Sequence, residues 1–241
     1  MPNPEDRQLD EAEFETLYQG DAPAGPKMPW DLGAPQPLVI ALADGGEFAG
    51  EVLDIGCGLG DNSVFLASCG LRVTGLDFAP SAVEQARARA AAKGVDVTFT
   101  VADARRLEGH EGRFDTVLDS ALYHCLDEQE RHEYIAGLTR ATRPGARLHL
   151  LCFSTEMPDV LPARHLVTEA NLRETVGAYW TIERLEPAVY TTAFDHEELR
   201  QSIEGIQGEE FDTSALAELA TDADGHVLFP IWRLKATRPA S

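Results

Sequence analysis

Basic side chains are scarce in this sequence. Its 241 residues include 20 lysines and arginines against 41 aspartates and glutamates, which gives a formal net charge of −21 at pH 7. A surface of this charge repels phosphate backbones and anionic lipid headgroups over most of its area. We therefore expect neither a nucleic-acid partner nor a membrane partner.

Long apolar runs and a secretory leader pattern are missing as well. Apolar stretches such as Arg147 to Phe153 are far shorter than the roughly 20 residues that a membrane span needs. The acidic N-terminus lacks the charged-then-apolar order of a signal peptide. The sequence predicts a cytoplasmic protein.

The cysteines and histidines show none of the spacings that metal sites use. Cys57, Cys69, Cys125 and Cys152 are scattered, without a Cys-x-x-Cys pair. The histidines form no His-x-x-x-His or His-Glu-x-x-His pattern, which would place two ligands on one helical face. We expect reduced, mostly buried thiols and no protein-bound metal.

What the sequence does contain is an alternation of apolar strand-like runs with helical patterns. Five runs come first, Val52 to Ile55, Arg72 to Leu76, Val95 to Val101, Thr116 to Leu118 and Arg147 to Phe153, and two more follow, Trp180 to Leu185 and Val227 to Ala236. This is the βαβ rhythm of a parallel sheet with helices on both faces. The pattern predicts an α/β fold with a doubly wound, seven-stranded, mostly parallel sheet.

Local signals mark where the intervening helices begin and end. Pro80 suits the first position of a helix that Gly94 would stop. Asp127 and Glu130 have the spacing of a capping box. We expect the helix that they open to end at Pro144-Gly145.

Length and apolar content fit a single domain over residues 1–241 with a small cap. Residues 1–37 combine an acidic helix with a connector, residues 20–37, that is rich in proline and glycine. Residues 154–177 form an insertion with a short helix from Thr168 to Val176, and we expect both segments to act as cap. An acidic helical region, Asp195 to Ala220, separates the last two strands.

The chemistry of the chain centres on the loop Asp54-Ile55-Gly56-Cys57-Gly58-Leu59-Gly60. Three glycines after a strand let the backbone turn tightly and approach a nucleotide-like ligand. A dinucleotide loop has a third glycine where this sequence has Asp61, and a carboxylate there would oppose a pyrophosphate. S-adenosylmethionine has no phosphate and carries a positive sulfonium, so the acidic residues favour it. The alternative is a tight turn without a ligand.

Two further acidic residues end strands in this region. Asp77 lies about 20 residues after the loop, where a carboxylate can accept hydrogen bonds from both ribose hydroxyls. Asp103 ends the next strand and is placed to accept from an adenine amino group. Asp77 could instead be a turn residue at the strand end.

With these motifs the sequence resembles the class I methyltransferases, through Val52 to Gly60, Leu76-Asp77, Ala102-Asp103-Ala104 and Phe114 to Asp119. It is most similar to small-molecule methyltransferases of the thiopurine and heterocyclic-toxin type, through Pro29 to Gly33, Gly112 to Val117 with Tyr123-His124, and Arg143 to Arg147. The likeness spans roughly Trp30 to Trp232.

This resemblance implies methyl transfer from S-adenosylmethionine to a hydroxyl, amine or thiol of a small aromatic or heterocyclic natural product. Together with the motifs, it assigns cofactor binding to Trp30, Asp54, Gly56, Cys57, Gly58, Gly60, Asp77, Phe78, Asp103, Ala104 and Asp119. Two other functions stay open, a cofactor-binding cyclase of a natural-product pathway and a non-catalytic cofactor-binding scaffold. The acceptor and the oligomeric state are not predicted.

Tyr123 and His124 follow the fourth strand, at the edge where doubly wound sheets open their ligand crevice. They are the predicted catalytic residues. His124 is the candidate base because a histidine titrates near neutral pH, and its alternative is a residue that only lines the crevice. Asp119 could orient that histidine or the cofactor, or it could cap a turn.

Overall fold

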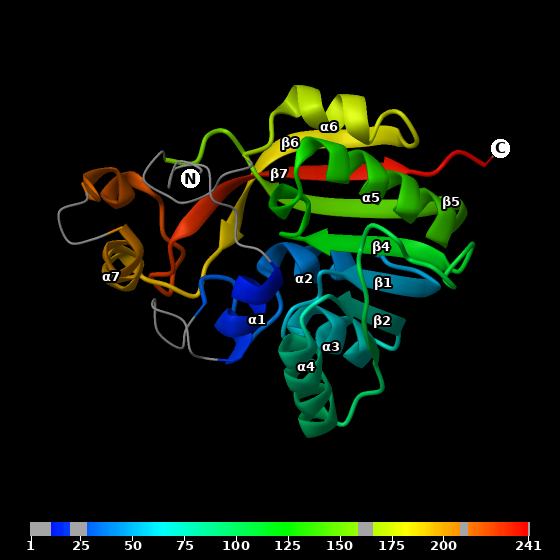
Figure 1. The fold of residues 1–241 in the computed structure, drawn as a ribbon, viewed down its shortest axis with the longest axis horizontal. Coiled ribbons are helices and arrows are strands. Elements are labelled where there is room, and N and C mark those ends of the chain that lie inside the picture. The colour runs from blue at the N-terminus through cyan, green and yellow to red at the C-terminus, as the bar shows by residue number, and fades with distance from the viewer. Residues whose placement is uncertain (1–10, 20–27, 159–165, 208–211, 241) are drawn as a thin grey trace.

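A seven-stranded sheet runs through the centre of the computed structural model, which describes residues 11–19, 28–158, 166–207 and 212–240 (Figure 1). The strands are β1 (Glu51–Ile55), β2 (Arg72–Asp77), β3 (Thr98–Val101), β4 (Phe114–Ser120), β5 (Thr142–Phe153), β6 (Thr181–Thr191) and β7 (Leu228–Thr237). The α-helices are α1 (Glu11–Gln19), α2 (Pro37–Asp44), α3 (Asp61–Ser68), α4 (Pro80–Lys93), α5 (Glu128–Ala141), α6 (Glu169–Thr175) and α7 (His196–Gln207). The described residues also include the short 3₁₀ helices η2 (Tyr123–Cys125) and η3 (Ser214–Glu218).

The strand order is β3-β2-β1-β4-β5-β7-β6. Strands β1 to β5 are parallel, whereas β7 is antiparallel to both β5 and β6. The predicted seven-stranded, mostly parallel sheet is therefore confirmed. Its winding reverses between β1 and β4, and a doubly wound sheet opens its ligand crevice at the carboxyl ends of strands at such a point.

Strands β1, β2 and β4 are buried on both faces of the sheet, which explains why they read as continuous apolar runs. Neighbouring residues of β1 point to opposite faces, so Leu53 joins one core cluster and Val52 another. Side chains of α5 and α6, including Ile135 and Leu172, complete the first cluster. The second includes Leu199 of α7 and other side chains from the opposite layer. Figure 1 shows α5 and α6 together over one part of the sheet.

The predicted helix signals act as the sequence indicates. Helix α4 begins at Pro80, and Gly94 ends it in the left-handed region at φ +67°. The capping box at α5 is complete, because Asp127 accepts from Glu130 N–H at 2.8 Å and Glu130 accepts from Asp127 N–H at 3.0 Å. The short helix predicted between Thr168 and Val176 is α6.

The predicted end of α5 is wrong. The helix ends at Ala141, and Pro144-Gly145 lies inside β5. The residue before a proline avoids helical backbone angles, so the chain is already extended there. Gly145 then takes φ +81°, and the pairing of β4 with β5 shifts its register across this segment. The pair that was expected to stop a helix instead forms an irregularity at the start of a strand.

Other boundaries differ from the prediction. The strand expected from Val95 starts only at Thr98, because Val95 N–H donates to Ala90 O at 3.2 Å and closes the end of α4. The acidic region Asp195 to Ala220 holds two elements, α7 and η3, and the short helix α2 was not predicted. Residues 1–10, 20–27, 159–165 and 208–211, which include parts of the predicted cap segments, lie outside the described residues.

Candidate active site

The glycine loop joins β1 to α3 at the carboxyl end of the sheet. Gly56, Gly58 and Gly60 all lie in the left-handed backbone region, at φ +69°, +50° and +82°. Side chains are strained in this region, which is why the turn needs glycine. Gly56 N–H donates to Leu76 O at 2.8 Å and fastens the loop to the end of β2.

The three glycines have different neighbours. A Cβ atom on Gly56 would meet Leu122 at 2.9 Å, and one on Gly60 would meet two core side chains at 2.8 Å. A Cβ on Gly58 would instead lie 3.1 Å from the hydroxyl of Tyr18, on α1. Packing inside the fold therefore explains the outer two glycines, whereas the middle one faces the helix that covers the loop.

Asp77 holds this loop in place. Its carboxylate accepts from the N–H of Gly58 at 2.8 Å and from that of Ala79 at 2.9 Å. The side chain is 6% exposed, and α1 lies over it. The structure thus gives Asp77 a role in shaping the loop, and its hydrogen bonds to a ribose stay a prediction.

Three buried carboxyl groups lie at the carboxyl ends of neighbouring strands. Asp54 on β1, Asp77 on β2 and Asp119 on β4 are each less than a tenth exposed. Burial raises the pKa of Asp54 and of Asp119 to about 7, and it also raises the pKa of Asp77. Within the described parts of the chain, no lysine or arginine bonds to any of the three. Such a place favours a positively charged ligand.

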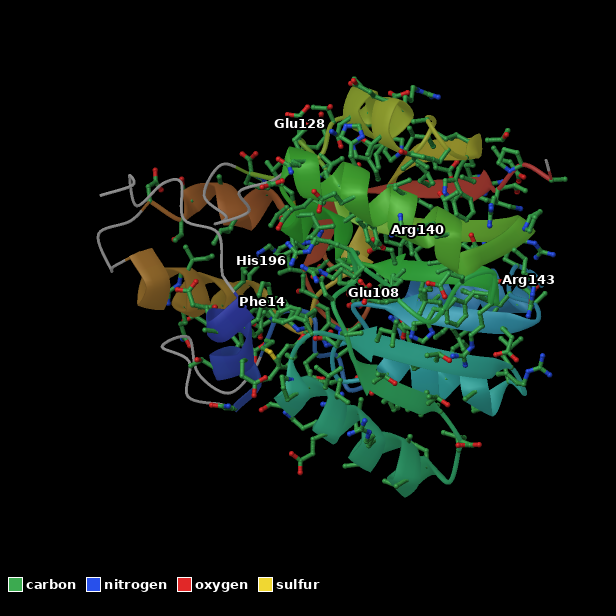
Figure 2. The ribbon with its side chains drawn as sticks, turned by 45° about the vertical axis from the view of Figure 1, so that its right-hand side comes forward. Phe14, Glu108, Glu128, Arg140, Arg143 and His196 are labelled. Atoms are coloured by element: carbon green, nitrogen blue, oxygen red, sulfur yellow. The ribbon has the colours of Figure 1, made fainter. Side chains whose placement is uncertain are left out.

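Helix α1 covers the loop with aromatic side chains. The Phe14 ring lies 6.1 Å from that of Trp30 and 5.7 Å from that of Phe78, and Tyr18 lies 6.5 Å from Trp30. Burial, and then the charge of Asp77, raise the pKa of Tyr18 well above its usual value. Trp30 Nε1 is buried without a hydrogen-bond partner, although the Tyr18 hydroxyl is nearby. Figure 2 shows Phe14 and the start of α7 on the same side of the molecule.

Two polar contacts attach α1 to α4. The Glu15 carboxylate accepts from Ser81 N–H at 3.1 Å and from the Ser81 hydroxyl, at the first turn of α4. Gln85 Nε2 donates to Tyr18 O at 2.8 Å. A carboxylate at the start of a helix also interacts favourably with the helix dipole. These contacts hold the aromatic cover over the glycine loop.

Asp103 has partners of its own. Its two carboxylate oxygens accept from Arg105 Nε at 2.8 Å and from Arg105 Nη2 at 2.9 Å, and these hydrogen bonds lower the pKa of the carboxyl group. Arg105 in turn pairs with Glu130 of α5. Ala104 packs against the core. Contact of Asp103 with an adenine amino group stays a prediction.

Asp119 shapes the turn after β4. One oxygen accepts from Leu122 N–H at 2.9 Å and from Tyr123 N–H at 3.3 Å, and the other accepts from the Tyr134 hydroxyl at 2.8 Å. This is the turn-capping arrangement, one of the two roles considered for Asp119. None of these bonds reaches His124.

Tyr123 and His124 are consecutive, but the structure does not bring them together at one surface. The Tyr123 side chain is fully buried, and its hydroxyl donates to Asn171 of α6 at 3.0 Å. His124 is half-buried and stacks on Phe153, with ring centroids 4.0 Å apart. Its Nδ1 accepts from Phe153 N–H at 3.4 Å. Tyr123 is a core residue in this structure, and only His124 remains placed at the strand ends.

Several site residues were not assigned from the sequence. Ser120 Oγ is buried without a hydrogen-bond partner, close to the hydroxyl of Tyr190 on β6. Burial raises the pKa of Tyr190 to about 12. The Glu15–Ser81 contact joins residues 66 positions apart. No local pattern marks such pairs, because only the fold brings them together.

A group with the geometry of metal ligands lies elsewhere, in the turn before β7. Asp222, Asp224 and His226 place their ligand atoms within 4.8 Å of one another. Asp222 already accepts from the N–H groups of the other two residues, at 2.9 Å each. These backbone hydrogen bonds to Asp222 are those of a turn, and they account for the closeness of the three side chains.

Known proteins similar to this chain include methyltransferases, which agrees with the glycine loop and the acidic strand ends. The family model described as a methyltransferase domain matches residues 52–145, which include the glycine loop. The chain is 36% identical over 229 residues to 2-heptyl-1-hydroxyquinolin-4(1H)-one methyltransferase of Mycobacteroides abscessus, covering 93% of this chain and 96% of that protein.

Solved structures extend the likeness to the whole fold. One protein, described for the conversion of a disulfide bond into a thioacetal group during echinomycin biosynthesis, matches with a TM-score of 0.77 and 31% identity over 95% of this chain and 92% of its own. The 1,6-didemethyltoxoflavin-N1-methyltransferase of Burkholderia thailandensis matches with a TM-score of 0.58 and 20% identity over 87% and 80%. With the sheet order, the glycine loop and the full-length relative in agreement, the chain belongs to the class I S-adenosylmethionine-dependent methyltransferases.

Proposed function

We propose that this enzyme methylates a hydroxyl oxygen of a small aromatic heterocycle of the hydroxyquinolone type, with a ring nitrogen or a thiol as the other acceptor atoms. The observation that carries the proposal is the 36% identity to the hydroxyquinolone methyltransferase, which extends over 93% of this chain. Because the match includes the segments around the site and not only the glycine loop, it supports a similar acceptor as well as a shared cofactor.

An aromatic cluster around Phe153, in which Tyr190 and Phe229 are buried and Phe153 and His124 are half-buried, supports a flat acceptor. Phe153 carries His124 on one face, and its ring meets Tyr190 and Phe229 edge-on at 6.1 and 5.6 Å. Flat heterocycles bind well between such rings, and a few polar atoms then fix their orientation. Ser120 Oγ and Trp30 Nε1 are buried polar atoms without partners here, so they are candidates for that orientation.

The same site suits S-adenosylmethionine. Asp54, Asp77 and Asp119 gather negative charge without a bonded basic side chain in the described residues, which favours a sulfonium ligand. When bound, the cofactor supplies an already activated methyl group. Gly58 and Asp77 would hold it from the sheet side, and Tyr18 of α1 and Trp30 of the connector before α2 would cover it. The chain then needs mainly to align the acceptor and exclude water.

The remaining assignments follow from this proposal. Gly56, Cys57, Gly60 and Phe78 would complete the wall of the cofactor site, with Asp103 and Ala104 on the adenine side. We treat residues 1–241 as one methyltransferase domain in which residues 1–37 and 154–177 form the cap.

We also propose that the enzyme works in the cytoplasm, a reducing compartment, and that its acceptor comes from a natural-product pathway. The four cysteines are free, and Cys69 is exposed, as suits the cytoplasm. Among the described helices, none has the length and apolar character to cross a bilayer.

The proposal can be tested with S-adenosylmethionine labelled in its methyl group. The acceptors are 2-heptyl-1-hydroxyquinolin-4(1H)-one, an aromatic amine and an aromatic thiol of similar size. We expect label transfer to the hydroxyquinolone with one S-adenosylhomocysteine released per product. Product without S-adenosylhomocysteine would instead indicate a cyclase. Binding of the cofactor without turnover of any acceptor would contradict the proposed acceptor class.

A further inference from the structure

The position of His124 is fixed by the different lengths of two neighbouring strands. Pairing of β4 with β5 stops at Ser120 and Leu151, and Ala121 N–H adds one more bond to Leu151 O. Strand β5 continues to Phe153, whose N–H faces the side that β4 has left. His124 Nδ1 accepts that N–H at 3.4 Å, and the imidazole stacks on the Phe153 ring at an interplanar angle of 19°.

This hydrogen bond determines which ring nitrogen carries the proton. An acceptor nitrogen holds no hydrogen, so the neutral ring of His124 carries its proton on Nε2. A base that acted through Nε2 would need the opposite tautomer, with Nδ1–H facing Phe153 N–H. Two donors would then oppose each other, and the strand N–H would lose its partner. The bound geometry makes Nε2 of His124 a donor.

Among the described residues, the titratable groups packed around η2 are already hydrogen-bonded, permanently charged or held protonated. Asp119 accepts three hydrogen bonds beneath the helix, and the Arg131 guanidinium lies over the Tyr123 ring at 5.1 Å. Burial raises the pKa of Cys125 beside His124 and of Tyr190 on β6 to about 12 each. Burial also raises the pKa of Cys152, on β5, well above its usual value. These thiols and this phenol stay protonated near neutral pH.

We propose that His124 donates a hydrogen bond from Nε2 to an acceptor that binds already ionised, and that the enzyme therefore selects acidic hydroxyl groups. This inference rests on the proposed function. The acceptor loses its proton to solvent before it binds. Its oxygen then forms the new bond to the methyl carbon with a lone pair, while the electrons of the methyl–sulfur bond go to the sulfur. No proton moves in this step.

Charge favours this assignment. An oxyanion and a sulfonium neutralise each other as the methyl group moves, and a site that excludes water strengthens their attraction. An N-hydroxyl conjugated with a ring carbonyl spreads its negative charge and ionises more readily than a phenol, whose pKa is near 10. The expected acceptors are such vinylogous acids, and the expected poor acceptors are ordinary phenols of the same size.

Two substitutions of His124 test the Nε2 donor independently of the hydrogen bond that Nδ1 accepts from Phe153 N–H. His124→Gln extends an amide nitrogen toward the place of Nε2, whereas His124→Asn keeps an acceptor oxygen near the place of Nδ1 but lacks the outer donor. With the hydroxyquinolone acceptor, we expect kcat/KM to fall about 10- to 100-fold in His124→Asn and less than about fivefold in His124→Gln. Thermal unfolding of both variants checks that each remains folded.

The pH profile distinguishes a donor from a base. If His124 donates to an ionised acceptor, the ratio of wild-type to His124→Asn rates stays constant above the pKa of the acceptor. If His124 is a base, that ratio falls towards one as the acceptor ionises by itself. Equal losses in both variants together with such rescue at high pH would overturn the inference.

Two measurements do not depend on turnover. Imidazole ¹⁵N chemical shifts of the enzyme with S-adenosylhomocysteine should show His124 protonated on Nε2, and an Nδ1–H tautomer would overturn the inference. The absorbance of the bound hydroxyquinolone should give a pKa about one unit or more lower in wild type and His124→Gln than in His124→Asn. Failure to methylate any acceptor would count against the proposed function, and these two readouts would still test His124.

Discussion

At the scale of single residues, the three glycines of the loop differ in what a side chain would contact. Gly56 and Gly60 have core side chains where a Cβ would be, so substitution there disturbs packing first. Among the described residues, a Cβ on Gly58 would meet only Tyr18 of the covering helix. It is the glycine at which a substitution reports on the cofactor.

We therefore expect Gly58→Val to remain folded and to lose at least about tenfold in affinity for S-adenosylhomocysteine, measured by calorimetry. The matched control is Gly70→Val. Gly70 is also in the left-handed region, at φ +86°, but has nothing within 4 Å of its Cβ position. It carries the same kind of backbone strain and should leave affinity unchanged. Native affinity in folded Gly58→Val would place the cofactor elsewhere.

Asp77 has two tasks, because its carboxylate holds the loop and is also predicted to bind ribose. Asp77→Ala should weaken cofactor binding by about 2 to 3 kcal/mol, as for other charged hydrogen-bond partners, and acceptor binding by less. Asp77→Asn keeps one carbonyl oxygen and should lose less than the alanine variant. An equal effect on both ligands would argue against a specific contact with the cofactor.

At the scale of elements, α1 is the described helix that covers the glycine loop, and its contacts with α4 can be removed without changing its aromatic side chains. Glu15→Ala removes the contacts with Ser81 and leaves the aromatic side chains of α1 unchanged. We expect S-adenosylhomocysteine to dissociate about two- to fivefold faster, as for the loss of a charge at a helix start. Thr16→Ala, at an exposed position of the same helix, is the control.

Stopped-flow fluorescence can follow the dissociation of S-adenosylhomocysteine, because Trp30 packs against the aromatic side chains of α1. An unchanged dissociation rate in Glu15→Ala would mean that α1 does not have to move for the ligand to leave.

Elements with local signals could be predicted from the sequence. Gly94 and the Asp127–Glu130 box act within a few residues of the helix ends that they mark. Pro144-Gly145 was misread because the same residues suit a helix stop and an irregular strand start, and pairing with β4 decides between them. The glycine loop is contiguous in the chain, so the sequence alone predicts it. The bond between His124 and Phe153 joins residues 29 positions apart, and nothing local predicts it.

At the scale of the whole molecule, acidity extends from the surface into the site. A net charge of −21 attracts cations over a long range, and three neighbouring strands end in buried carboxyl groups. An anionic acceptor is repelled by the same field. We therefore expect the cofactor to bind first and to supply the positive charge that the acceptor needs. Added salt should slow association of the cofactor and speed that of the acceptor.

The last prediction compares the two forms of the cofactor, which differ in charge at the sulfur. The pKa values of Asp54 and Asp119 are about 7, and a nearby sulfonium lowers them. The complex then holds fewer protons than the free enzyme, so binding releases protons. The affinity for S-adenosylmethionine therefore increases as the pH rises towards and through about 7.

Between pH 6 and pH 8 we expect an increase of about three- to tenfold for S-adenosylmethionine. S-adenosylhomocysteine has a neutral sulfur and the same amino-acid and nucleoside groups, so its affinity should change much less. Calorimetry with both ligands measures the difference, and Asp54→Asn should reduce it because one of the titrating groups is gone. Parallel pH profiles for the two ligands would show that these carboxyl groups do not sense the sulfonium, and the buried acidity would then have to serve the fold alone.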